Sequence, residues 1–144
     1  MLQFYSFYLE VKKNKDKYKS RLVIYQPPQI LLLKKHGSKT KYSLVGGFVD
    51  EGETPREGLI REAYEEVGML IDTDELYLLS KIRGKKDRNL VKYYYLLNNH
   101  NKHYELKEVD KFHDFLWVDI KEAVKFLEGT DKAVVKLHFL DDDF

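Results

Sequence analysis

Apolar residues recur along the chain in short runs that are rich in β-branched and aromatic side chains, a pattern typical of strands. Such runs predict strands at residues 2–11, 21–25, 30–35, 42–45, 76–83, 90–97 and 115–119. Pro27 and Pro28 separate the second run from the third, because proline cannot donate the ladder hydrogen bonds of a strand. Polar segments predict loops at 12–21, 36–39 and 84–89, and the last of these closes a hairpin.

A helix is predicted between Thr54 and Gly68, and both of its ends carry recognisable signals. Thr54 can cap the N-terminus, Pro55 suits the first helical position, and Glu57 completes a capping box. Gly68 suits the left-handed conformation that often follows the last helical turn. One side of this helix is apolar and is expected to pack on a sheet: Leu59, Ile60, Ala63 and Val67.

The order of the elements indicates the fold class. Strands come first, then one helix, then more strands, and two further helices are predicted at residues 120–129 and 131–140. This order favours a mixed sheet sandwiched by helices, an α/β/α arrangement. The chain has 144 residues, 43% of them hydrophobic, and shows no repeat or linker, so residues 1–144 are expected to form a single domain.

Charge and cysteine content exclude several classes of function. The net charge is +1, so no overall field favours a polyanion or an anionic membrane. The absence of cysteine excludes disulfides, thiol nucleophiles and cysteine-based zinc sites, and it fits a reducing cytoplasm. The apolar runs are far too short to span a membrane, and the N-terminus lacks the features of a signal peptide. We therefore expect a cytoplasmic protein without membrane contact.

Glutamates are concentrated on one face of the predicted central helix. Glu62, Glu65 and Glu66 lie three and four residues apart, although like charges at this spacing disfavour a helix by a few tenths of a kcal/mol. Gly46 and Gly47 precede the helix, where a glycine backbone can approach a ligand closely. Clustered carboxylates are the ligands that Mg²⁺ prefers, and it usually shares such a site with substrate phosphates. The alternative is a solvated acidic face with occasional salt bridges.

The full string around these glutamates resembles the box of the Nudix hydrolase family. It reads Gly47, five residues, Glu53, seven residues, Arg61-Glu62-Ala63, one residue, Glu65-Glu66, one residue, Gly68-Met69, with every fixed position filled. The flanking segments extend the resemblance to about residues 20–128. The family often has Trp-x-x-Pro before the two glycines, and this chain has Tyr42-Ser43-Leu44-Val45 instead.

The resemblance to the MutT-like members implies a metal-dependent hydrolase on an α/β/α sandwich with a loop–helix–loop metal site. Such enzymes cleave a phosphoanhydride in a nucleoside diphosphate linked to another group, with Mg²⁺ or Mn²⁺. By the resemblance, Glu62, Glu65 and Glu66 bind the metal, and the Gly46 carbonyl is a further ligand. Because the metal would hold the reacting phosphate, Glu62 and Glu65 also count as catalytic.

Two further box residues have catalytic roles by the same resemblance. Arg61 orients the catalytic carboxylates, and Glu53 pairs with Arg61 and holds the preceding loop against the helix. The general base stays open, because the family uses either a box glutamate or a carboxylate of a later loop. Glu105 and Glu108 are the late candidates here, and exposed loop charges are the alternative interpretation.

The substrate is constrained mainly by features that the sequence lacks. The three prolines are Pro27, Pro28 and Pro55, so the prolines that follow the box in ADP-ribose and NADH hydrolases are missing. A nucleoside triphosphate, cleaved to a monophosphate and pyrophosphate, is the favoured substrate. Side chains that could contact it are basic residues of the predicted hairpin and tyrosines of its second strand: Arg83, Lys85, Lys86, Arg88, Tyr93 and Tyr95. A charged turn and core packing are the respective alternatives.

Other functions with the same motif stay open. One is a hydrolase of RNA 5′ ends or caps, in which nucleic acid is bound only as a 5′-end substrate, and another is a dinucleoside polyphosphate hydrolase. A third is a nucleotide-sensing module that binds without cleaving. A small-molecule nucleotide is the expected partner, and the sequence leaves the oligomeric state open, a homodimer included.

Overall fold

The computed structural model describes residues 15–37, 41–98 and 101–140. Its first sheet contains β1 (Lys17–Val23), β5 (Val45–Phe48), β6 (Leu76–Arg83) and β7 (Leu90–Leu97) in the order β5-β1-β7-β6. β1 and β7 are parallel, whereas the β1–β5 and β6–β7 pairs are antiparallel, so this sheet is mixed. In the second sheet, β3 (Gln29–Lys35) pairs antiparallel with β2 (Tyr25–Gln26), β4 (Lys41–Ser43) and β8 (Phe112–Asp119).

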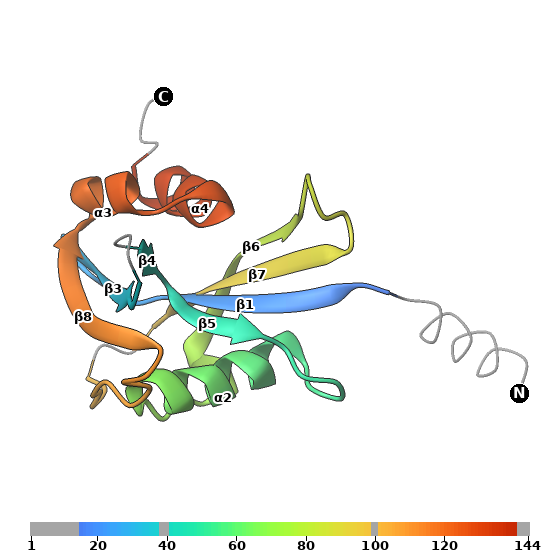
Figure 1. The fold of residues 1–144 in the computed structure, drawn as a ribbon, viewed down its shortest axis with the longest axis horizontal. Helices are drawn as coiled ribbons and strands as arrows, with labels where there is room; N and C mark the ends of the chain where they lie inside the picture. Colours follow the sequence, from blue (N-terminus) through green and yellow to red (C-terminus); the bar gives the residue numbers. More distant parts are fainter. Residues whose placement is uncertain (1–14, 38–40, 99–100, 141–144) are drawn as a thin grey trace, which may run out of the picture.

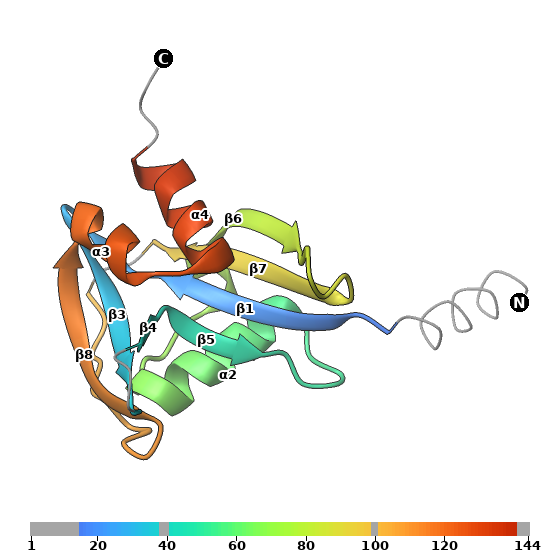
Figure 2. The same ribbon diagram turned by 45° about the horizontal axis from the view of Figure 1, so that its top comes forward.

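Helices cover the strands from two sides, which confirms the α/β/α arrangement. The helix α2 (Pro55–Val67) lies on one side of β1 and β5, and α3 (Ile120–Phe126) and α4 (Gly129–Phe139) lie on the other (Figure 1; Figure 2). A short 3₁₀ helix, η1 (Thr73–Glu75), precedes β6. Within the described part of the chain, no helix is long and apolar enough to cross a membrane.

Alternation along β1 divides the apolar core into two layers. Leu22 packs in the layer toward α2 with Leu59 and Val67, whereas its neighbour Val23 packs in the layer toward α3 and α4 with Val135. Successive side chains of a strand point to opposite faces, so one strand contributes to both layers. The polar residues of β1 follow the same alternation, and this places Arg21 on the side opposite α2.

Four sequence expectations about strands are corrected by the structure. The expected loop at 12–21 is wrong for residues 17–21, because they form most of β1. The expected strand at 42–45 is interrupted at Leu44, and β5 continues through both glycines to Phe48. The strand expected at 115–119 begins already at Phe112, and the strands form two sheets instead of one. The strand expected at 2–11 lies outside the described residues.

The close approach of β5 to β1 explains why the strand can continue through the glycines. Gly46 has a φ of 136°, and a Cβ atom there would lie 2.0 Å from the carbonyl oxygen of Ser20. Only glycine fits this position, because any side chain would collide with the β1 backbone. A glycine pair that resembles a loop in sequence is therefore part of the sheet, directly beside α2.

Candidate active site

Both predicted caps of α2 are present, and they fix where the helix starts and ends. The hydroxyl of Thr54 accepts a hydrogen bond from the Glu57 N–H at 3.2 Å, and the Glu57 carboxylate accepts one from the Thr54 N–H at 2.9 Å. Gly68 ends the helix in the left-handed conformation with a φ of 65°. Because α2 packs its apolar side on the core, the caps and the packing together set the direction in which its glutamates point.

Arg61 connects the loop before α2 to the glutamates on the helix. Its Nε donates to Glu53 Oε2 at 2.9 Å, and its Nη2 donates to Glu53 Oε1 at 3.1 Å and to the Phe48 carbonyl at 3.0 Å. Its Nη1 donates to Glu62 Oε1 and Glu65 Oε2, each at 3.2 Å. These contacts raise the pKa of Arg61 and lower the pKa of Glu53. The expected Arg61–Glu53 pair thus exists, and the same guanidinium orients two of the expected metal ligands.

Glu66 is a fully buried carboxylate, and only one of its two oxygens accepts a hydrogen bond from a described residue. Its Oε1 accepts a hydrogen bond from the Gly46 N–H at 2.7 Å, whereas its Oε2 has no hydrogen-bond partner among the described residues. The nearest cation is the Lys111 ammonium, 3.8 Å from Oε2. Burial is the largest cause that raises the pKa of Glu66, to about 8. A buried carboxylate in this state favours a cation in its vicinity.

Gly47 makes room for the carboxylate of Glu62. A Cβ atom at Gly47 would lie 2.8 Å from Glu62 Oε1, so a side chain at this position would displace the carboxylate. Glu62 is mostly buried, and desolvation is the main cause that raises its pKa. The second glycine of the pair is therefore explained by the site: it lets a helix carboxylate lie against the β5 backbone.

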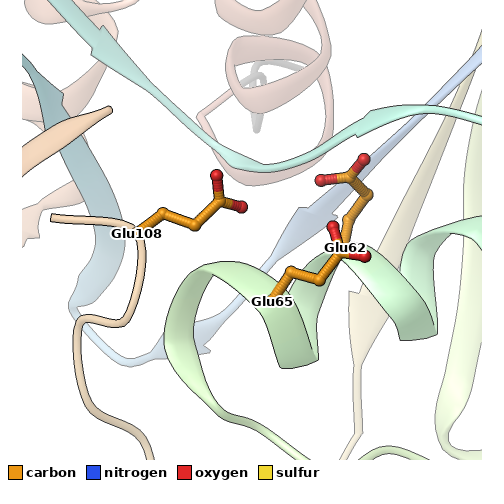
Figure 3. Close-up of side chains that lie close together, drawn as sticks. All are labelled: Glu62, Glu65 and Glu108. Carbon is orange, nitrogen blue, oxygen red and sulfur yellow. The ribbon is translucent and has the colours of Figure 1, made fainter. Parts of the chain in front are cut away.

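Glu108 joins the helix glutamates from a distant part of the chain. One carboxylate oxygen each from Glu62, Glu65 and Glu108 lie within 4.8 Å of one another, and Figure 3 shows Glu108 facing the two helix residues from the opposite side. Three carboxylates at this spacing offer only hard oxygen donors. This donor set fits Mg²⁺ or Mn²⁺, both of which prefer oxygen ligands.

Backbone hydrogen bonds hold the segment that carries Glu108 against the end of α2. The Glu105 N–H donates to the Val67 carbonyl at 2.8 Å, and the Lys107 N–H donates to the Glu66 carbonyl at 2.9 Å. The last carbonyls of a helix have no partners within the helix, so this segment satisfies them and is placed by them. Of the two late carboxylates expected from the sequence, the structure brings Glu108 into the cluster and leaves Glu105 outside it.

The expected ligands Glu66 and Gly46 lie beside each other, at one side of the carboxylate cluster. The Gly46 N–H binds Glu66, and the Gly46 carbonyl accepts a hydrogen bond from Arg21 Nη1 at 2.9 Å. A carbonyl oxygen has two lone pairs, so this contact leaves one acceptor site on Gly46. The role of both residues as metal ligands stays a prediction.

A cavity of about 300 Å³ opens beside Glu62, and sequence reasoning missed most of its wall. Four basic residues line it together with Gly46 and Gly47: Lys19, Arg21, Lys35 and Lys111. Burial and the surrounding positive charges lower the pKa of both Lys19 and Lys35. Like charges held together in this way favour an anion between them. The missed signal was the period-two spacing of Lys19 and Arg21, which is typical of one face of a strand.

The basic hairpin residues expected to bind substrate lie elsewhere. Arg83 pairs with Asp16 at 2.8 and 2.9 Å and donates to the Arg88 carbonyl at 2.6 Å. In Figures 1 and 2 the β6–β7 connection lies near the start of β1, far from the segment that carries Glu108. Neither Arg83 nor the three other basic residues, Lys85, Lys86 and Arg88, line the cavity beside Glu62. This placement does not support the sequence expectation that they contact the substrate.

The two expected substrate tyrosines pack on the α2 side of the sheet. Tyr93 contacts Tyr18, with ring centroids 6.1 Å apart, and stacks on Tyr95 at 6.4 Å. Tyr95 is 3% exposed and belongs to the core layer below α2, where the Arg56 guanidinium lies 4.9 Å from its ring centroid. Neither tyrosine lines the cavity beside Glu62. The structure thus places them as core packing requires.

Comparison with known proteins supports the same family as the sequence motif does. A model of the NUDIX domain matches residues 18–138 of the chain, which include every element of the site described above. No curated protein matches the sequence.

Several solved structures share the fold. The MutT NUDIX hydrolase from Burkholderia pseudomallei superposes with a TM-score of 0.66 and 20% identity, covering 84% of this chain and 96% of that one. A structure from a study of MutT from Aliivibrio salmonicida and Vibrio cholerae gives 0.71 and 19%, covering 86% and 97%. An ADP-ribose pyrophosphatase from Streptococcus suis gives 0.64 and 15%, covering 89% and 95%. Identities this low establish a shared fold, so the substrate must be inferred from this chain's own residues.

Proposed function

The chain belongs to the NUDIX family, and from that premise we propose that it cleaves a nucleoside triphosphate into a monophosphate and pyrophosphate with the help of Mg²⁺. As a MutT-like Nudix hydrolase, it is a pyrophosphohydrolase that acts on nucleoside diphosphate derivatives. The proposal adds the triphosphate, the products and the metal. We also propose that residues 1–144 form one domain that acts in the cytoplasm on a small-molecule nucleotide.

One observation carries the proposal: an acidic cluster and a basic cavity meet at Glu62. Glu62 belongs to the carboxylate group with Glu65 and Glu108, and it also lines the cavity with Lys35 and Lys111. A divalent cation neutralises the first set, and a chain of phosphates neutralises the second. A phosphate chain that extends from the carboxylates into the cavity satisfies both sets at once. A triphosphate offers more phosphate oxygens for such a chain than a nucleoside diphosphate sugar does.

The metal would be held by Glu62, Glu65 and Glu66, with Glu108 as a further oxygen donor and the Gly46 carbonyl beside Glu66. Bound there, Mg²⁺ neutralises phosphate charge and makes water more acidic, and Mn²⁺ can supply the same chemistry. Arg61 keeps two of the carboxylates in fixed positions, and Glu53 keeps Arg61 in place. Positioning and charge stabilisation of this kind are most of what phosphoryl and nucleotidyl transfer require.

We assign the general base to Glu108 in preference to Glu105. Glu108 lies in the carboxylate cluster and Glu105 does not. A carboxylate at the cluster can accept the proton of the attacking water, whereas a carboxylate outside it is too far from the reacting phosphate. The proton then leaves to solvent, because Glu108 is only partly buried.

Hydrolysis of a nucleotide panel tests the proposed function. The purified protein is incubated with nucleoside triphosphates, ADP-ribose, dinucleoside polyphosphates and RNA with a 5′-triphosphate, each with and without Mg²⁺, and the products are identified by chromatography. We expect metal-dependent release of monophosphate and pyrophosphate, fastest from the nucleoside triphosphates. Preference for ADP-ribose or RNA would replace the proposed substrate. Binding of nucleotide without any product would instead support a sensing module.

A further inference from the structure

The chain around Glu108 has no regular secondary structure of its own. Residues 101–111, called the Glu108 segment below, contain neither a helix nor a strand, and β8 begins directly after them. Figure 3 shows Glu108 projecting from this segment toward α2. A group that takes part in a reaction must be held close to one geometry, and groups on loops depend on neighbouring elements for this. Contacts with other elements therefore determine where Glu108 lies.

Lys102 attaches the start of the Glu108 segment to the chain that follows α2. Its ammonium donates to the Leu70 carbonyl at 2.8 Å and to Glu75 Oε1 at 2.7 Å. The Lys102 and Glu75 side chains are only 18% and 15% exposed, so solvent screens this ion pair less than it screens a surface pair. The Asp72 N–H also donates to Glu75 Oε1, at 2.9 Å, and this holds the partner of Lys102 in place.

His36 attaches the end of the Glu108 segment to β3. Its Nε2 lies 2.7 Å from the Val109 carbonyl oxygen, and its backbone N–H donates to the Lys111 carbonyl at 3.3 Å. Because a carbonyl oxygen only accepts hydrogen bonds, Nε2 carries a proton and donates in this contact. His36 directly follows β3, which pairs with three other strands, so the attachment point belongs to a well-supported element.

Glu108 occupies the first position of a turn that leads into β8. Its carbonyl accepts hydrogen bonds from the Lys111 N–H at 3.1 Å and from the Phe112 N–H at 2.9 Å. His36 binds the carbonyl of the next residue, Val109, and so holds this turn against β3. The rotamers open to a side chain depend on the backbone angles of its residue, so the orientation of the turn sets the direction of the Glu108 carboxylate.

The two attachment residues lie outside the site itself. Neither His36 nor Lys102 belongs to the carboxylate cluster, and neither lines the cavity beside Glu62. Any effect of these two residues on the reaction must therefore pass through the Glu108 segment.

We propose that His36 and Lys102 are positioning residues, which hold the two ends of the Glu108 segment and thereby keep the Glu108 carboxylate at the helix glutamates. The inference rests on the proposed function, in which Glu108 is the general base, and adds the residues on which the position of this base depends. His36 has the larger role, because it binds the residue next to Glu108, whereas Lys102 lies at the far end of the segment.

A double-mutant cycle between His36 and Glu108 tests this inference without requiring turnover. Mn²⁺ binding is followed by the electron paramagnetic resonance signal of the free ion. We expect His36→Ala to weaken Mn²⁺ binding by about fivefold, as the loss of one hydrogen bond would. In the Glu108→Gln background, the same substitution should change the Kd by less than about twofold, because no carboxylate remains to be displaced. Equal losses in both backgrounds, or no loss in either, would overturn the inference.

His36→Gln separates the hydrogen bond from a general loss of structure. The glutamine amide nitrogen can take the place of Nε2 and donate to the Val109 carbonyl, so the Kd for Mn²⁺ should stay within about twofold of the unaltered protein. His103→Ala is the matched control, because His103 is exposed in the same segment. If His36→Gln bound Mn²⁺ as weakly as His36→Ala does, the hydrogen bond would not be the cause.

The combined variant Lys102→Met, Glu75→Gln tests the other end of the segment. Removing both partners avoids leaving a shielded carboxylate unpaired, so the fold should be retained. We expect kcat for triphosphates to fall by about threefold, as for a partly shielded ion pair, with KM changed by less than about twofold. Lys125→Met, Glu122→Gln removes an exposed pair on α3 and is the control. An unchanged kcat would overturn the role of Lys102.

Failure of the proposed function has a different signature from failure of this inference. If the proposed function fails, triphosphates are not hydrolysed by the unaltered protein, yet the effects of His36→Ala and Glu108→Gln on Mn²⁺ binding remain coupled. If the inference fails, hydrolysis proceeds and the two substitutions act independently on Mn²⁺ binding.

Discussion

The acidic face of α2 and the basic β6–β7 connection are both clusters of like charge in the sequence, yet the structure treats them differently. Glu62 and Glu65 converge with Glu108, and Glu66 is fully buried beside them. In the connection, Arg83 is paired with Asp16, and the lysines and arginine that follow lie exposed in a turn. A run of like charge therefore indicates a site only when other segments force its members together.

The segments that bring the carboxylates together surround α2, and the β6–β7 connection has no equivalent segments. The Gly46 N–H donates a hydrogen bond to Glu66, and Gly47 leaves space for the carboxylate of Glu62. Backbone hydrogen bonds between the segment before β8 and the end of α2 hold Glu108 at the cluster. Holding carboxylates together without solvent is unfavourable unless a cation compensates for them. The β6–β7 connection avoids this cost, because its charged side chains are exposed to water and do not converge. Four predictions, from the largest expected effect to the smallest, test this difference.

Replacement of a cluster carboxylate should have the largest effect on activity. Glu65→Gln is expected to lower kcat by about 10²- to 10³-fold, as is typical when one group that stabilises transition-state charge is lost. Stability should change by less than about 0.5 kcal/mol, because the side chain is half exposed and its removal relieves repulsion. Steady-state kinetics and denaturant unfolding measure the two effects. Glu51→Gln, in the exposed turn before the helix, is the control, and a parallel loss of stability in Glu65→Gln would indicate a structural role instead.

The stability of the metal-free protein should depend on pH through Glu66. The folded state retains this proton up to a pKa of about 8, whereas the ordinary value is 4.5. Because the unfolded chain then binds fewer protons between these values, the free energy of unfolding falls as the pH rises through this window. We expect a loss on the order of 3 kcal/mol between pH 5 and pH 8. Urea unfolding of Glu66→Gln should give a much flatter profile, and identical profiles for the two proteins would refute this origin.

Glu108 and Glu105 provide a matched pair on one segment. Glu108→Gln should lower kcat/KM by about 100-fold, the low end of the range for the loss of a general base. Glu105→Gln should leave it within about twofold, because its carboxylate lies outside the cluster. Kinetics at saturating Mg²⁺ measure both variants. Equal losses would mean that the geometry does not distinguish the two carboxylates.

The basic connection should tolerate change best. The combined substitution Lys85→Gln, Lys86→Gln and Arg88→Gln is expected to alter kcat/KM for nucleoside triphosphates by less than about twofold, because exposed charges far from a site act weakly through salt solution. Lys35→Gln, in the cavity, should raise KM by about tenfold. If the combined variant raised KM as much as Lys35→Gln does, the contrast between the two regions would not hold.

The parts of the site that depend on short spacing were predictable from the sequence. Thr54, Glu57 and Gly68 mark the ends of α2 through contacts within one or two turns, and both caps are present. The Arg61–Glu53 pair spans only the loop and the first two turns of the helix, and the family resemblance identified it before the structure did. Local signals of this kind depend little on the rest of the fold.

The missed parts depend on contacts between distant segments. Glu105 and Glu108 look alike in sequence, and only the hydrogen bonds between their segment and the end of α2 distinguish them. The first part of β1, residues 17–20, resembles a loop in sequence because the polar face of this strand, with Lys19 and Arg21, faces a cavity and not the core. Composition of a strand signals burial, so a strand that lines a charged cavity has little apolar signal.

Binding of Mn²⁺, followed by the loss of the electron paramagnetic resonance signal of the free ion, tests the central claim most directly. We expect the unaltered protein to bind Mn²⁺ saturably and Mg²⁺ to displace it. Glu65→Gln and Glu108→Gln should each weaken Mn²⁺ binding by about tenfold or more, whereas the combined variant of the β6–β7 connection should bind as the unaltered protein does. Binding that is absent, or that is equally strong in all of these proteins, would contradict a metal site built by α2 and the segment before β8.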